Sequence, residues 1–104
     1  LTDHFHKHKK INDQFLFKAG VAAFESGQHH DWTIKHLDRL VKNYPTSRLY
    51  RGAKLWMALT YLKQGKEDKF FNTVEEFRKK YRNTDEWEIL SHHYETIVQK
   101  YKRN

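Results

Sequence analysis

Two stretches of this chain repeat the same order of residues, and this repetition restricts its possible folds more than any other feature. The segment "FLFKAGVAAFESGQ" has the pattern of "AKLWMALTYLKQGK", and "LDRLVKNYPTS" has the pattern of "VEEFRKKYRNT". As a result, Gly27 and Gly65 stand about 38 residues apart, and Tyr44 and Tyr81 about 37. A period of this size indicates stacked copies of one supersecondary unit that bury one another's faces.

Apolar residues within each copy recur every three or four positions, which predicts helices rather than strands. Gly27 and Gly65 end two of them, because glycine readily adopts the left-handed conformation of a helix C-cap. Pro45 ends another, since it cannot continue a helix, and Thr46 or Ser47 can cap the next one through its hydroxyl. We expect five helices, over about 11–25, 31–44, 47–64, 67–82 and 84–103.

The fold class predicted from this pattern is all-α, with about two and a half tandem antiparallel helix–turn–helix repeats. At 104 residues the chain is expected to form one domain. We expect a polar leader over 1–10 and the repeat domain over 11–104. Within that domain the first repeat covers about 13–45, the second about 47–82, and a terminal capping helix about 84–103.

The formal net charge of +7 favours a partner with an acidic surface. Basic residues mostly stand beside acidic ones, as in "EEFRKKYR", which is typical of solvated helix faces. No stretch is long and apolar enough to predict a membrane span, and the chain has no cysteine for disulfides or thiolate sites. Because the sequence starts at Leu1 without a methionine, we expect a processed or excised piece of a longer protein.

Histidine is the residue type here that most suggests chemistry. His4, His6 and His8 alternate, so an extended chain would place them on one face, where they could bind a divalent metal weakly. We favour a solvated leader instead, and we predict no metal site and no cofactor. His92 and His93 are adjacent on a predicted helix, so their side chains point about 100° apart and cannot chelate one ion together. No nucleophile or glycine-rich phosphate motif accompanies them, so we predict that the chain is not an enzyme.

Nucleic-acid binding is the alternative function that the sequence raises. Arg48 and Arg51 follow Pro45 closely and could contact phosphate, and interleaved aromatic and basic residues could stack bases. We favour Pro45 as the boundary between two units, with both arginines solvated on the first turns of the next helix. Most aromatic residues fall at helical spacing, which predicts that they form the core.

The repeated residues resemble those of the tetratricopeptide repeat family over about 13–104. The match rests on Gly20 and Ala58 at the small position of the first helix, on the two turn glycines, and on "YPTS" at the end of the unit. The chain is most similar to the bacterial subset found in the outer-membrane barrel-assembly lipoprotein and the Tol–Pal coordinator protein. This resemblance implies a periplasmic or cell-envelope location, with the cytoplasm as the alternative.

The resemblance also implies that the first helix of each unit lines a concave, partner-binding surface. Superposing the units assigns candidate contact residues to that surface: Phe17, Val21, Phe24, Leu55, Leu59, Leu62, Lys63, His92, Thr96 and Lys100. The three leucines could instead pack inward. The expected function is a non-catalytic protein–protein interaction scaffold within a larger bacterial, envelope-associated assembly.

The array is expected to end at the last helix. Glu95 there stands where the earlier units have Gly20 and Ala58. A following helix could not pack closely at this position without burying a charge. We also expect that removal of residues 85–104 exposes the apolar face of the preceding helix, over about 67–82, and causes aggregation.

Overall fold

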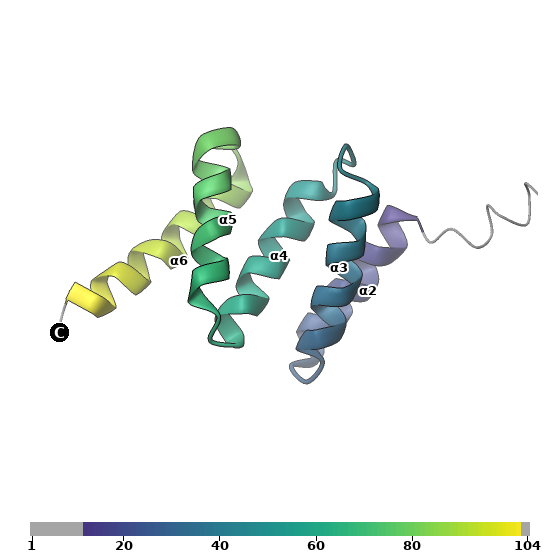
Figure 1. Cartoon of the computed structure of the whole chain (residues 1–104), viewed down its shortest axis with the longest axis horizontal. Coiled ribbons are helices and arrows are strands. Elements are labelled where there is room, and N and C mark those ends of the chain that lie inside the picture. Colours follow the sequence, from purple (N-terminus) through teal and green to yellow (C-terminus); the bar gives the residue numbers. More distant parts are fainter. Residues whose placement is uncertain (1–11, 103–104) are drawn as a thin grey trace, which may run out of the picture. The chain divides into compact units, whose positions relative to one another are not determined.

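The computed structural model describes residues 12–102, and within this range the chain is all-α, as the sequence predicts (Figure 1). The predicted leader and its histidines lie outside the described residues. Short turns separate the helices, which are α2 (Asp13–Ser26), α3 (His30–Asn43), α4 (Tyr50–Lys63), α5 (Glu67–Lys80) and α6 (Asp85–Lys102). None of the described helices is long and apolar enough to cross a membrane.

Both turn glycines act as the sequence predicts. Gly27 has a φ of 74°, in the left-handed region, and its N–H donates to the Phe24 carbonyl as the C-cap of α2. Gly65 has a φ of 77° and follows α4, where its N–H donates to the carbonyl of Leu62. A residue with a Cβ would be strained at either position.

The connection between α3 and α4 is longer than expected, because α4 begins at Tyr50 rather than near Ser47. Residues 45–49 form turns instead. The backbone carbonyl of Ser47 accepts a hydrogen bond from the Tyr50 N–H, and the side-chain hydroxyl oxygen of Ser47 accepts one from the Leu49 N–H at 3.0 Å. That hydroxyl also donates to Asp13 Oδ2 at 2.5 Å, which ties the turn to the first residue of α2. Ser47 therefore stabilises the turn before α4 and lies outside the helix.

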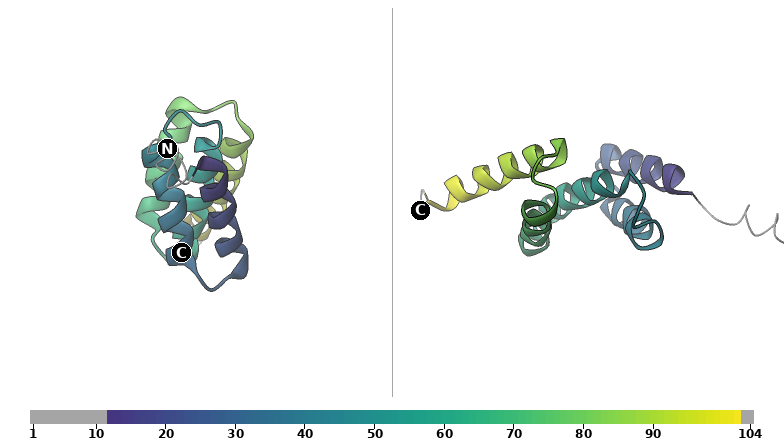
Figure 2. Two further views of the ribbon diagram at one scale, coloured as in Figure 1. Left: turned by 90° about the vertical axis from the view of Figure 1, so that its right-hand side faces the viewer. Right: turned by 90° about the horizontal axis from the view of Figure 1, so that it is seen from above.

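The described part of the chain divides into two compact units, the first ending at Met57 and the second beginning at Ala58, and α4 runs through the boundary. In the first unit α2 and α3 form an antiparallel hairpin and lie side by side (Figures 1 and 2). Leu16, Leu37 and Leu40 have no exposed surface and belong to its core. Gly20 makes close packing possible, because a Cβ at this position would lie 2.5 Å from Leu37 Cδ2.

The second unit has its own core, in which Phe70, Phe77 and Leu90 are fully buried. Thr84 caps α6: its hydroxyl oxygen accepts from the Trp87 N–H at 3.2 Å and its hydroxyl donates to the Tyr81 carbonyl. The helix accordingly begins near Thr84, as the sequence predicts.

Candidate interaction site

The predicted contact residues of the first unit take part in its packing. Phe17, Val21 and Phe24 are half-buried, whereas Leu55 is only 7% exposed. The Phe17 ring approaches Gly52, where an added Cβ would lie 3.1 Å from Cε1, and the Phe24 ring meets the Trp56 ring edge-on at 4.9 Å. Leu55 therefore packs inward, and only part of each of the other three side chains is available to a partner.

The predicted contact residues of the second unit are more accessible. Leu59 and Leu62 are half-buried, and four polar or charged residues are exposed: Lys63, His92, Thr96 and Lys100. The Thr96 hydroxyl donates to the His92 carbonyl, and Lys100 Nζ lies 5.7 Å from the centre of the Tyr101 ring. The surface that would join these residues to those of the first unit stays a prediction.

His92 and His93 have ring centres 6.1 Å apart at an interplanar angle of 74°. Partial burial, and next the neighbouring His92 charge, lowers the pKa of His93 below its ordinary value. Within residues 12–102, no three side chains of the metal-binding types come together in a candidate metal centre. The alternating histidines of the leader lie outside that range.

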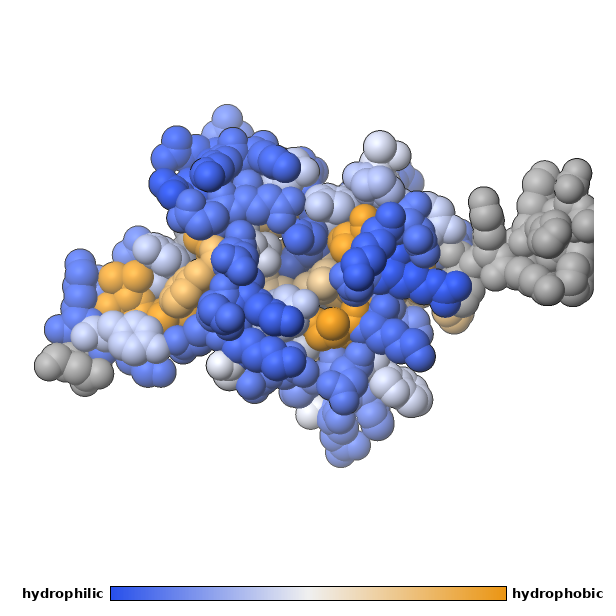
Figure 3. Space-filling view, viewed as in Figure 1, coloured by the Kyte–Doolittle hydropathy of each residue, from blue (hydrophilic) through white to orange (hydrophobic). Residues whose placement is uncertain are grey.

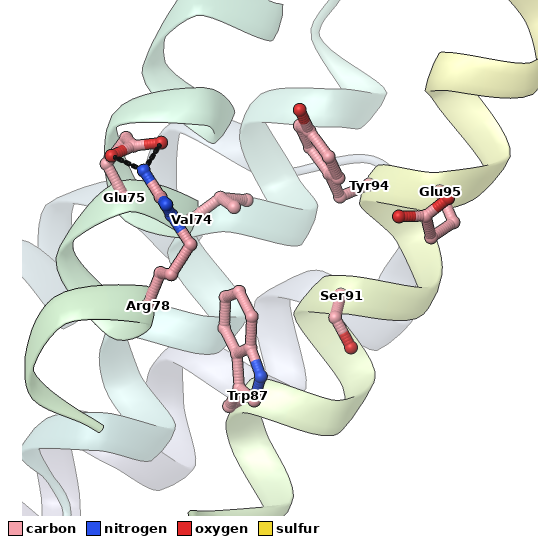
Figure 4. A pocket seen from close by; sticks show the side chains of 7 residues that line it. All are labelled: Val74, Glu75, Arg78, Trp87, Ser91, Tyr94 and Glu95. Atoms are coloured by element: carbon pink, nitrogen blue, oxygen red, sulfur yellow. Dashed lines mark hydrogen bonds and ion pairs between the residues drawn. The ribbon is translucent and has the colours of Figure 1, made fainter. Parts of the chain in front are cut away.

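A pocket of about 360 Å³ lies between α5 and α6 in the second unit (Figure 4). Val74, Glu75 and Arg78 line it from α5, and Figure 4 shows the facing side chains of α6. Those are Trp87, Ser91, Tyr94 and Glu95. Sequence reasoning missed this site, because it depends on which face of α6 turns toward α5. The spacing of Trp87, Ser91 and Glu95 at every fourth position is the signal that could have placed them on one face.

The charges in this pocket are only partly compensated. Both carboxylate oxygens of Glu75 accept from Arg78 Nη2, at 2.5 and 2.7 Å (Figure 4). Glu95 is exposed, and its carboxylate has no ion pair or hydrogen bond with any other residue of the described range. The Tyr94 ring meets Phe71 edge-on at 5.9 Å, which holds this aromatic wall in place. The pocket therefore combines aromatic surface with one uncompensated carboxylate.

The repeat pattern gives this pocket a counterpart in the first unit. On α2, the buried residues are Leu16, Gly20 and Ala23, and the Gly20 position is in contact with Leu37 of α3. The equivalent positions on α6 are Ser91, Glu95 and Val98, all at least partly exposed. The buried residues of α6 are instead Leu90 and Ile97. Among residues 12–102, the face of α2 that α3 covers thus corresponds to an open face on α6, which is at least partly exposed.

Large hydrophobic or aromatic residues of α6 are also exposed at its surface. Ile89 is 43% exposed and Tyr101 is 53% exposed. Figure 3 shows apolar residues in orange among hydrophilic ones over α6, at the left of the view. Neither of these two residues lines the α5–α6 pocket.

Comparison with known families matches residues 14–47 to the tetratricopeptide repeat. The match covers α2 from its second residue, all of α3 and the first part of the turn that follows, and so includes Gly20, Gly27 and Pro45. Comparison with curated proteins and with solved structures finds no match. Tetratricopeptide repeats are typically non-catalytic and generally mediate protein–protein interaction. The α2–α3 hairpin, with its glycine-mediated helix contact and its proline-marked end, is therefore similar to one repeat of the tetratricopeptide repeat family.

Proposed function

We propose that this chain is a non-catalytic protein–protein interaction module that binds a segment of a partner protein within a larger assembly. The observation that carries the proposal is the α2–α3 hairpin, which matches a repeat family that mediates such interactions. The proposed contact residues lie on the first helix of each repeat, namely α2, α4 and α6. Helical repeats commonly use such a surface to recognise an extended or helical segment.

The partner in this proposal presents an acidic surface. The net charge of +7 supports this choice, as do the exposed side chains of Lys63 and Lys100. Charge complementarity of this kind mainly accelerates association, so binding should weaken as the salt concentration rises. We further propose, from the resemblance of the repeat residues to those of bacterial envelope proteins, that the assembly lies in the periplasm or at the cell envelope, with the cytoplasm as the alternative.

Photo-crosslinking in the cells that make the protein tests this function. A photoreactive phenylalanine derivative replaces Thr96, which is exposed on the predicted surface, or Lys35, an exposed control position on α3. We expect a discrete protein adduct from position 96 that survives nuclease treatment and is absent from position 35. The charge reversals Lys63→Glu and Lys100→Glu should reduce its yield.

A nuclease-sensitive adduct at position 96 would contradict the proposal and favour nucleic-acid binding. Equal adducts at both positions would contradict the choice of surface. Leu55 is unsuitable for such tests, because it is buried and its truncation would disturb the core.

A further inference from the structure

The open face of α6 differs in chemistry from the face of α2 that α3 covers. Where α2 has Gly20 against Leu37, α6 has Glu95 at the edge of the α5–α6 pocket. An apolar side chain seated here would remove water from the Glu95 carboxylate without replacing its hydrogen bonds, which is costly. A cationic side chain would supply them. The position therefore selects against an apolar contact and in favour of a basic one.

The walls of the pocket support the same choice. Trp87 and Tyr94 line it from α6, and the faces of such rings attract cations. Arg78 also lines the pocket, but both oxygens of Glu75 engage it, so its charge is already compensated. One carboxylate and two aromatic side chains are left to receive an incoming cation.

We propose that the α5–α6 pocket binds an arginine side chain presented by an amphipathic helix of a partner protein. Arginine fits better than lysine, because its planar guanidinium can pair with both oxygens of Glu95 while it stacks on an aromatic ring. Apolar residues one turn away on the same helix would contact Trp87, which lines the pocket and is half-buried. The pocket shares no lining residue with the predicted concave surface, so the two sites can be tested separately.

A partner protein, rather than a second copy of this chain, is the occupant favoured by charge. Two copies each carry a net charge of +7 and repel one another as they approach. A partner helix that is acidic overall and has one central arginine avoids this repulsion. It still supplies the cation that Glu95 lacks.

The test is a double-mutant cycle between peptide and protein. The probe is a fluorescent, covalently stapled helix of about 15 residues, long enough for a stable helix, with leucines one turn on either side of a central arginine. A second peptide carries citrulline at this position, which keeps the shape and removes the charge. Fluorescence anisotropy gives the Kd of each peptide for the natural protein, for Glu95→Gln and for the matched control Glu88→Gln. Glu88 is an exposed acidic residue of α6 that does not line the pocket.

We expect the arginine peptide to bind the natural protein about tenfold more tightly than the citrulline peptide, as for a partly desolvated charge pair. This preference should disappear in Glu95→Gln and persist in Glu88→Gln. The preference for the arginine peptide should also persist in Lys100→Glu, because Lys100 belongs to the predicted concave surface. The result at the α5–α6 pocket can therefore be distinguished from the result for the proposed function.

Three results would overturn the proposal. The first is equal binding of the two peptides by the natural protein, and the second is an arginine preference that survives Glu95→Gln. The third is concentration-dependent dimerisation in sedimentation experiments that Glu95→Gln abolishes, because the occupant would then be a second copy of the chain.

Discussion

The α2–α3 hairpin and the α5–α6 pair differ in the side chains at equivalent positions of their helices, and in what those positions contact. On α2, Gly20 lets Leu37 approach so closely that a Cβ would collide with it. On α6, the equivalent Glu95 stays exposed at the edge of a pocket of about 360 Å³. Both helices still bury an apolar face, with Leu16 in one and Leu90 in the other fully buried.

This difference shows that helical periodicity and helix pairing are specified separately. The three-to-four spacing of apolar residues produces a helix with a buried face in both units. Whether a second helix can pack closely on another face depends on side-chain size and charge at the point of contact. A glycine permits such a contact, whereas at Glu95 we propose that the exposed face binds a partner with complementary charge.

Truncation of Leu37 should have the largest effect on this comparison. Leu37 is fully buried and contacts the Gly20 position, so Leu37→Ala should lower the free energy of unfolding by about 2–5 kcal/mol. Urea denaturation followed by circular dichroism measures this loss. The exposed control Lys35→Ala should change stability by no more than about 0.5 kcal/mol. Equal effects of the two substitutions would contradict the close packing of α3 on α2.

The pair Gly20→Ala and Glu95→Ala tests the equivalent positions directly. An added Cβ at position 20 forces Leu37 to move, so we expect a loss of about 1–3 kcal/mol despite the better helix propensity of alanine. At position 95 the same alanine removes an exposed side chain, and we expect a change within about 0.5 kcal/mol. Urea midpoints of both variants measure the difference. A more stable Gly20→Ala variant would contradict the claim that the close contact with Leu37 needs glycine at this position.

Ser47 provides a smaller test, because its hydrogen bonds connect α2 to the turn before α4. Ser47→Ala removes the bond to Asp13 and the bond from the Leu49 N–H, and should cost about 1 kcal/mol. Thr46→Ala is the matched control. Thr46 is exposed, and its hydroxyl is the other one that the sequence offers as a cap for the next helix. Thermal unfolding of the two variants distinguishes them. A larger loss of stability in Thr46→Ala than in Ser47→Ala would show that Thr46, and not Ser47, stabilises this turn.

The smallest expected effect is a pH dependence of the second unit. Burial, followed by the His92 charge, lowers the pKa of His93 in the folded state below the ordinary value of 6.5. The unfolded chain therefore binds this proton more readily, so the free energy of unfolding should fall as the pH drops below about 6.5. Urea midpoints at intervals between pH 7.5 and pH 5.5 measure the slope, and His93→Gln should reduce it. An unchanged slope in His93→Gln would show that other groups cause the dependence.

The sequence contains most of the information needed for the fold. Gly27 and Gly65 need a left-handed conformation, and each has it after the helix it was expected to end. The start of α4 was wrong by three residues, because Ser47 can form hydrogen bonds in a turn as well as at the first residue of a helix. Local preference alone does not decide between the two, since the contact with Asp13 comes from a distant part of the chain.

The candidate sites were less predictable than the helices. Superposing repeats assigned Leu55 to a binding surface, but periodicity cannot distinguish a buried face from an exposed apolar one, and Leu55 is buried. The α5–α6 pocket was missed because its walls come from two helices whose mutual rotation no local pattern specifies. Only Glu95 was singled out from sequence, as a position that resists close packing; Glu95 is exposed, and the end of the array at α6 stays a prediction.

The central claim is that the same face is covered on α2 and open on α6, and thiol labelling tests it most directly. The chain has no cysteine, so Ala23→Cys and Glu95→Cys each introduce a single reporter. Ala23 is buried on the face of α2 that contains Gly20, whereas Glu95 is exposed on α6. We predict that Cys at position 95 reacts with a thiol reagent about as fast as an unfolded peptide does, and that Cys at position 23 reacts roughly 100-fold more slowly. Equal protection at the two positions in the monomeric protein would contradict the account.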